Sequence, residues 1–76
     1  MNQSRRNQLR DIWQQLRDIH ERLDILCDEE QEAYDNMPES IRDSARGDAA
    51  QSAIDTLESV RDQVLEAADE IDEIFE

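Results

Sequence analysis

Two pairs of carboxylates have a spacing that could serve metal-dependent chemistry. Glu29 and Glu32 lie three residues apart, as do Glu66 and Asp69, so on a helix the members of each pair would share a face. Four carboxylates converging on magnesium would suit the hydrolysis of a nucleotide. The chain register derived below places the two pairs at opposite ends of the molecule, where only an antiparallel dimer could bring them closer. We therefore expect no such centre.

The single histidine and the single cysteine are the other candidates for chemistry. His20 and Cys27 would share a helical face two turns apart, about 10 Å along the axis at ~1.5 Å per residue. That separation is too large for an imidazole to activate a thiolate within one chain. A lone cysteine forms no internal disulfide, and with one histidine it builds no zinc site. We expect no catalytic residue, no metal, no cofactor and no enzymatic activity.

Charge excludes further classes of function. The chain has 76 residues, with 21 acidic side chains against 8 basic ones, all arginine, so its formal net charge is −13. Nucleic acids and anionic membranes require a basic surface, so neither is expected as a direct partner. There is no run of 18 apolar residues, and the arginine pair Arg5 and Arg6 is not followed by the apolar stretch of a targeting signal. We expect one cytoplasmic domain spanning residues 1–76.

The elements that must carry these side chains are two long helices with a heptad pattern. Apolar residues alternate at spacings of three and four, which marks the a and d positions of a coiled coil. In the first half they are Leu9, Ile12, Leu16, Ile19, Leu23, Leu26, Ala33 and Met37, with Glu30 at the remaining a position, and in the second Ala50, Ala53, Leu57, Val60, Val64, Ala67, Ile71 and Ile74. The e positions are also largely apolar, so the stripe is three columns wide. Such a width is typical of a helix that contacts two neighbours in a bundle.

A break near the middle separates the two helices. Pro38 lacks an amide hydrogen and disfavours helix at the preceding residue, and Ser44 is suited to cap the second helix. The sequence therefore predicts a helix over about 4–35, a loop over about 36–44 and a helix over about 45–75. Near-equal helices joined by a short break predict an all-α antiparallel two-helix hairpin, similar to a coiled coil.

Folding the chain about residue 40 gives a register and a candidate dimer contact. Leu16 then faces Val64, Trp13 faces Ala67 and Ala68, and the N-terminal arginines lie beside the acidic end of the second helix. Because two helices enclose little core, we expect dimerisation into a four-helix bundle. The e column is the predicted dimer interface, and it comprises Trp13, His20, Cys27, Tyr34, Ile54 and Phe75.

The outward face of the second helix is acidic. Five acids occupy its f positions at strict seven-residue spacing, and others fill the neighbouring columns. The predicted partner-binding residues are Asp48, Asp55, Asp62, Glu66, Asp69, Asp72, Glu73 and Glu76. This edge could imitate the phosphates of a nucleic acid and occupy the basic groove of a nucleic-acid-binding protein. The alternative is a solvated face that keeps a small helical protein dispersed in water.

The segment between the two predicted helices has a sequence pattern that is similar to a known group of proteins. The run from Glu29 to Ser40, with Asn36-Met37-Pro38-Glu39-Ser40 as its most specific part, followed by Ser44 to Gly47, resembles small acidic helical-hairpin proteins encoded in phages, prophages and mobile elements of Gram-positive bacteria. The match covers roughly residues 28–60. That family has no settled activity and no catalytic residues to carry over. The resemblance implies a phage-type accessory protein, located in the host cytoplasm.

These observations predict a small acidic protein that binds another protein. The leading hypothesis is a phage-type inhibitor or modulator that docks on a host protein with a basic surface, such as a defence nuclease, as a nucleic-acid mimic. The alternative is a structural or assembly protein that acts through homo-oligomerisation, without enzymatic activity. In that alternative the apolar e column would carry the interaction.

Overall fold

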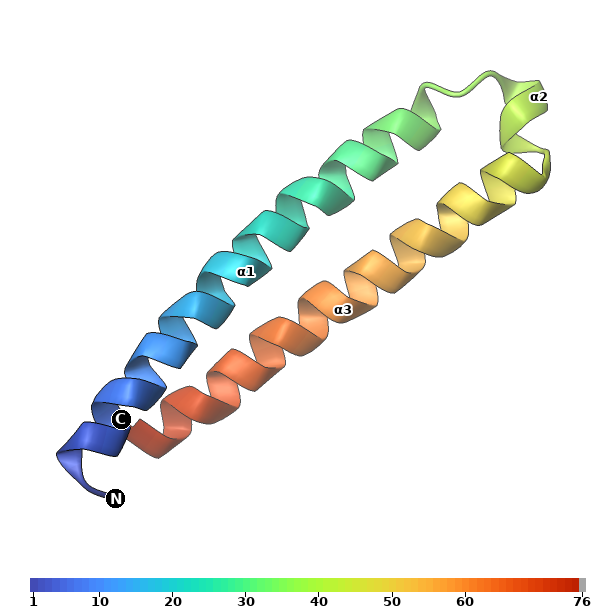
Figure 1. Cartoon of the computed structure of the whole chain (residues 1–76). Helices are drawn as coiled ribbons and strands as arrows, with labels where there is room; N and C mark the ends of the chain where they lie inside the picture. The colour runs from blue at the N-terminus through green and yellow to red at the C-terminus, as the bar shows by residue number, and fades with distance from the viewer. Residues whose placement is uncertain (76) are drawn as a thin grey trace.

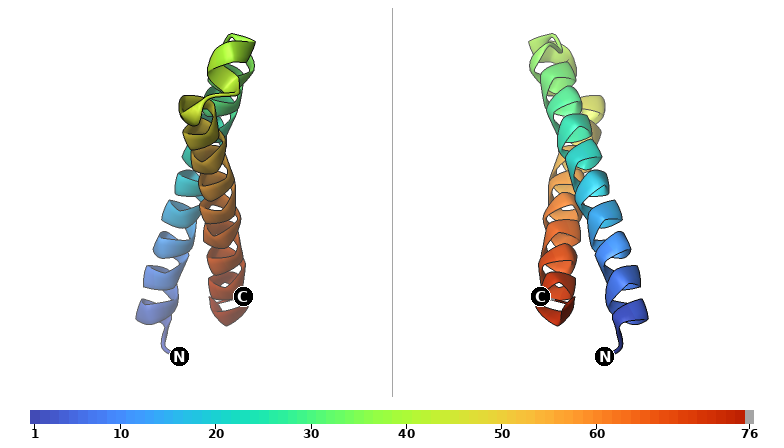
Figure 2. Two further views of the ribbon diagram at one scale, coloured as in Figure 1. Left: turned by 90° about the vertical axis from the view of Figure 1, so that its right-hand side faces the viewer. Right: turned by 90° about the vertical axis from the view of Figure 1, so that its left-hand side faces the viewer.

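The computed structural model describes residues 1–75, and they form a helical hairpin. Two long helices, α1 (Gln3–Asp35) and α3 (Ala45–Phe75), run antiparallel, and a single helical turn, α2 (Glu39–Arg42), lies between them. The Cα atoms span 58 × 14 × 13 Å, so the molecule is a rod (Figure 1). The two long helices cross at a shallow angle (Figure 2). The predicted all-α class is confirmed, and no strand occurs in these 75 residues.

Local hydrogen bonds set the ends of α1. At its start, Oδ1 of Asn2 accepts a hydrogen bond from the amide of Arg5 at 2.8 Å, which satisfies one of the amides that a helix leaves free. At its end, the amide of Asn36 donates to the carbonyl of Glu32, and the chain then turns at Pro38. The helix thus runs one residue beyond the predicted N-terminal bound and stops at the predicted Asp35.

The predicted loop contains α2, which packs on the first turn of α3. The Ser44 hydroxyl donates to the carbonyl of Ile41 instead of accepting from an α3 amide, while the Ser44 carbonyl accepts from the amide of Asp48 at 3.0 Å. Gly47 is buried against α2, where a Cβ would overlap the carbonyl of Arg42. The close approach of the two backbones therefore requires a residue without a side chain at position 47.

This packing shifts the register between the long helices. Arg61 pairs with Asp24, and the guanidinium of Arg10 lies over the ring of Phe75; in both contacts the residue numbers add to 85, not to the predicted 80. The first turn of α3 packs on α2. A residue of α1 therefore faces a residue of α3 that lies about five positions, or roughly one turn, further along the chain than predicted. The predicted contact of Trp13 with Ala67 and Ala68 is thus corrected, since Trp13 lies against Phe75.

The core lies along the e columns of both helices. The buried apolar side chains are Cys27, Ile54, Ala68 and Phe75, with exposed fractions of 0–8%. Trp13, His20 and Tyr34 are half-buried on the same column of α1. Apart from Ala68, these are the residues predicted to form the dimer interface, and the structure places them between α1 and α3 of one chain. The e and a columns close the hairpin, which leaves the d columns on its surface.

Candidate interaction surfaces

The open end of the hairpin is held by an aromatic cluster, comprising Trp13, Phe75, Arg10 and Arg17. The two rings meet edge to face with centroids 6.0 Å apart. The guanidinium of Arg10 lies 5.2 Å from the centroid of Phe75, and that of Arg17 lies 5.7 Å from Trp13. Both distances are within the range of cation–π attraction. Arginine at this end of the rod therefore packs on aromatic rings.

The predicted ion pairs between this end of α1 and the acidic end of α3 do not form among residues 1–75. The ion pairs here both involve Arg61, whose Nη1 lies 3.2 Å from Asp24 and whose Nε lies 3.1 Å from Asp62. The hydrogen bond to Asp62 raises the pKa of Arg61, and the nearby carboxylates add to this effect against the opposing cost of desolvation. The charged end of Arg61 thus projects out of the apolar seam, and its ion pair with Asp24 links α3 to α1.

The acidic face of α3 is open to solvent. Asp48, Asp55, Asp62 and Asp69 are exposed along the f column, and so are Glu66 and Glu73 in the neighbouring column. Asp72 is half-buried, and Glu76 lies outside the described residues. Two of these carboxylates accept hydrogen bonds within α3, namely Asp55 from Gln51 at 3.0 Å and Asp62 from Arg61. The acidic edge is therefore continuous along α3 and is neutralised by arginine at one point.

A second surface, here called the apolar face, is formed by the d columns of both helices. Its members are Ile12, Ile19, Leu26 and Ala33 on α1 and Ala53, Val60, Ala67 and Ile74 on α3, all of them exposed. The isoleucines, Leu26 and Val60 have exposed fractions of 40–52%. When positions a and e form the seam of a heptad, position d lies on one side of the seam and positions b and f lie on the other. The apolar and acidic faces therefore point in different directions.

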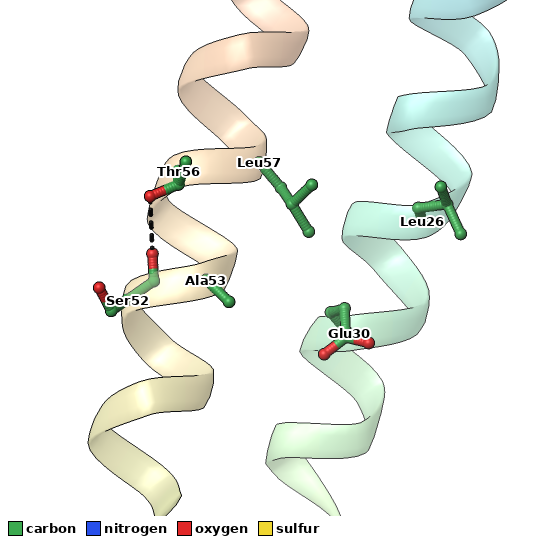
Figure 3. Close-up of a pocket in the computed structure, with 6 residues that line it drawn as sticks. All are labelled: Leu26, Glu30, Ser52, Ala53, Thr56 and Leu57. Carbon is green, nitrogen blue, oxygen red and sulfur yellow. Dashed lines mark hydrogen bonds between the residues drawn. The ribbon is translucent and has the colours of Figure 1, made fainter.

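The apolar face is hollowed near its middle. A shallow groove of about 610 Å³ is lined by Leu26 and Glu30 of α1 and by Ala53 and Leu57 of α3, with Ser52 and Thr56 at its rim. Figure 3 shows Leu57 and Ala53 pointing from α3 toward α1, and the Thr56 hydroxyl turned away to the Ser52 carbonyl at 3.1 Å. The lining is mostly aliphatic, with one carboxylate, so its chemistry suits an apolar side chain.

The groups considered for catalysis are not brought together. Glu29 and Glu32 lie toward the loop end of the rod, and Glu66 and Asp69 lie toward the open end. Cys27 is buried in the seam. Among residues 1–75, no group of three histidine, cysteine or acidic side chains is placed to hold a metal ion. Nor does any helix in this part of the chain have the length and apolarity needed to cross a membrane.

Two features were not recognised from the sequence. The first is Gly47, whose isolated position in a helix was a signal of close backbone approach. The second is the outward orientation of the d columns. The width of the apolar stripe indicated a second neighbour, but column d and column e, which lie on either side of the a column, are both largely apolar. Nothing in the pattern alone ranked column e above column d for the intrachain contact.

No protein-family model, curated protein or solved structure matches the chain.

Proposed function

We propose that this chain is a non-catalytic binding protein whose acidic face docks on a basic surface of a partner protein and inhibits or modulates that partner. The supporting observation is the open row of carboxylates on α3, of which Asp48, Asp55, Asp62 and Asp69 repeat every seven residues on one exposed column. At ~1.5 Å per residue the repeat is about 10 Å. A helix holds these charges at fixed intervals, so they are ordered before a partner arrives.

The charge distribution supports a protein partner that otherwise binds nucleic acid. A formal net charge of −13 repels nucleic acid itself, whereas a basic groove would attract a rod with an acidic edge. Arg10 and Arg17, which lie near the end of this edge, contact Phe75 and Trp13 instead. The resemblance of the inter-helix segment to phage-type hairpins adds the context of a phage-type accessory protein. A host defence nuclease is a partner whose basic groove would suit the acidic face.

The test is affinity capture from a bacterial lysate at low salt and at about 0.5 M salt, where exposed charges more than a few ångströms apart are screened. The wild-type chain should retain a basic nucleic-acid-binding protein at low salt only. The variant Asp55→Asn/Asp62→Asn/Asp69→Asn should lose it, with affinity falling at least about tenfold. A control with the same change of charge on α1, Asp28→Asn/Glu32→Gln/Asp35→Asn, should bind nearly as well. Equal losses in both variants would refute recognition by the acidic face.

A second candidate function is structural, through homo-oligomerisation into a four-helix bundle. The exposed apolar face favours it. A compact monomer of 8.9 kDa should expose about 4,800 Å², and this hairpin exposes 5575 Å². The excess is comparable to the roughly 800 Å² that each partner buries in an ordinary protein interface. Sedimentation equilibrium tests this candidate, since a chain that stays monomeric up to millimolar concentration would exclude it.

A further inference from the structure

The apolar face differs from the rest of the surface in its charge. Positions a, d and g of both helices form this face and its edges, and their charged residues are Arg5, Arg22, Arg46, Glu29, Glu30 and Glu70. Three arginines and three glutamates cancel, so the whole formal charge of −13 resides on the other columns and in the inter-helix segment. A second copy would be repelled from every side except this one.

The dimensions of the face match a stable interface. The rod is 58 Å long and 14 Å wide, which gives a footprint of about 800 Å², the area buried per partner in a standard interface. Solvent-exposed Ile19, Leu26 and Val60 lie along its centre. Large aliphatic side chains at this density are typical of a surface that becomes buried on association.

We propose that a second copy of this chain covers the apolar face, with the loops of the two hairpins at opposite ends and α1 lying on α1 of its partner. This inference rests on the self-association proposed above, and it specifies the face and the orientation. The charges on the face determine the orientation. With α1 antiparallel to its copy, Arg22 lies level with Glu29 of the partner subunit when the two-fold axis passes near position 26.

The same two-fold axis also pairs opposite charges on α3. Arg46 and Glu70 of the partner subunit lie level when α3 crosses its copy near position 58. In the register of the hairpin, where facing residue numbers add to about 85, position 58 is level with position 27 on α1. Two independent pairs of opposite charge therefore select one axis, within about two residues. Leu26 is exposed at this point and would meet its own copy.

The alternative orientation, with both loops at one end, lacks these contacts. There α1 lies on α3 of its partner at equal height, which places Arg22 level with Gln63 of the partner subunit. Arg46 and Glu70 remain at opposite ends of the rod, so neither opposite-charge pair forms. In the proposed orientation, Leu26 of the partner subunit lies on Leu26 of this chain, which forms one wall of the groove. An aliphatic side chain is what the lining of that groove suits.

Disulfide trapping tests the orientation. In a Cys27→Ala background, which removes the buried thiol, Leu26→Cys should form a disulfide-linked homodimer under mild oxidation, because position 26 lies on the two-fold axis. A mixture of the Leu26→Cys chain with a Val60→Cys chain should give little mixed disulfide. If the loops were at one end, position 26 would face position 60 of the partner, and the mixed disulfide would predominate. That result would overturn the proposed orientation while leaving self-association intact.

Charge exchange provides a second readout. Arg22 and Glu29 are both exposed, so their replacement leaves the hairpin core unchanged. Arg22→Glu or Glu29→Arg alone should raise the dimer dissociation constant about tenfold, because each puts two like-charged pairs in the interface. The double variant should return to within about threefold of wild type. Failure of rescue would refute this axis, and a wild-type chain that is monomeric at millimolar concentration would refute self-association itself.

Discussion

Replacing Ile54 by alanine tests which column of the heptad holds the hairpin together. Ile54 is the largest fully buried side chain, with an exposed fraction of 1%. The substitution removes three carbons, which at about 0.8 kcal/mol each gives a loss of about 2.4 kcal/mol. The cavity adds to this loss, and the better helix propensity of alanine returns about half a kcal/mol. The free energy of unfolding should therefore fall by about 2–3 kcal/mol.

Ile19 is the matched control, because it is the same residue type at the centre of the other long helix but in the d column. Its exposed fraction is 42%, so alanine there removes little more than half as much buried surface. After the same correction for helix propensity, Ile19→Ala should lower the free energy of unfolding of the monomer by about 1 kcal/mol.

Urea denaturation followed by circular dichroism measures both variants, at protein concentrations that range from dilute to concentrated. Ile54→Ala should be destabilised at every concentration. Ile19→Ala should lose about 1 kcal/mol when dilute, and should also lose most of any stabilisation that appears when the wild type is concentrated. If Ile19→Ala cost as much as Ile54→Ala at the lowest concentration, the assignment of the e column to the intrachain seam would be wrong.

Four further substitutions, of which Ala49→Gly is a control, use the same denaturation measurement. Gly47→Ala should destabilise the hairpin by about 1–3 kcal/mol through overlap with α2, although alanine is the better helix former. The control is Ala49→Gly at an exposed position, which should lose about 1 kcal/mol through helix propensity alone. A gain in stability for Gly47→Ala would contradict the packing of α2. Phe75→Leu should cost about 1 kcal/mol by removing the edge-to-face contact, and the emission of Trp13 should move to longer wavelength; an unchanged spectrum would contradict that contact. Asp24→Asn should cost less than about 1 kcal/mol, because the ion pair that it removes is partly exposed, and the difference from wild type should vanish at high salt.

The helical elements could be predicted from the sequence because their determinants are local. Pro38 interrupts the helical pattern, and the three- and four-residue spacing runs without a break on either side of the inter-helix segment. The heptad also indicated that the long helices contact one another along an apolar stripe. The exposure of the f-column acids followed from the same period, since position f lies far from a seam centred on positions a and e.

The register and the choice of seam could not be predicted in this way. The register depends on whether α2 extends the loop or packs on α3, and that is settled by the fit of Gly47 under the carbonyl of Arg42. The seam depends on which of two apolar columns, d or e, faces the partner helix. The large aromatic residues Trp13 and Phe75 lie in column e, and their rings meet edge to face between the two helices.

The sequence by itself thus determined that the chain forms two long helices, where each begins and ends, and that the outward face of the second helix is acidic. These properties depend on the order of residues within a few turns. Only the tertiary structure decided that the predicted dimer residues close the hairpin and that the d columns stay exposed, because that choice depends on how two curved surfaces of similar hydrophobicity fit against each other. The uncovered face is the consequence of that fit, and it is where a second copy is expected.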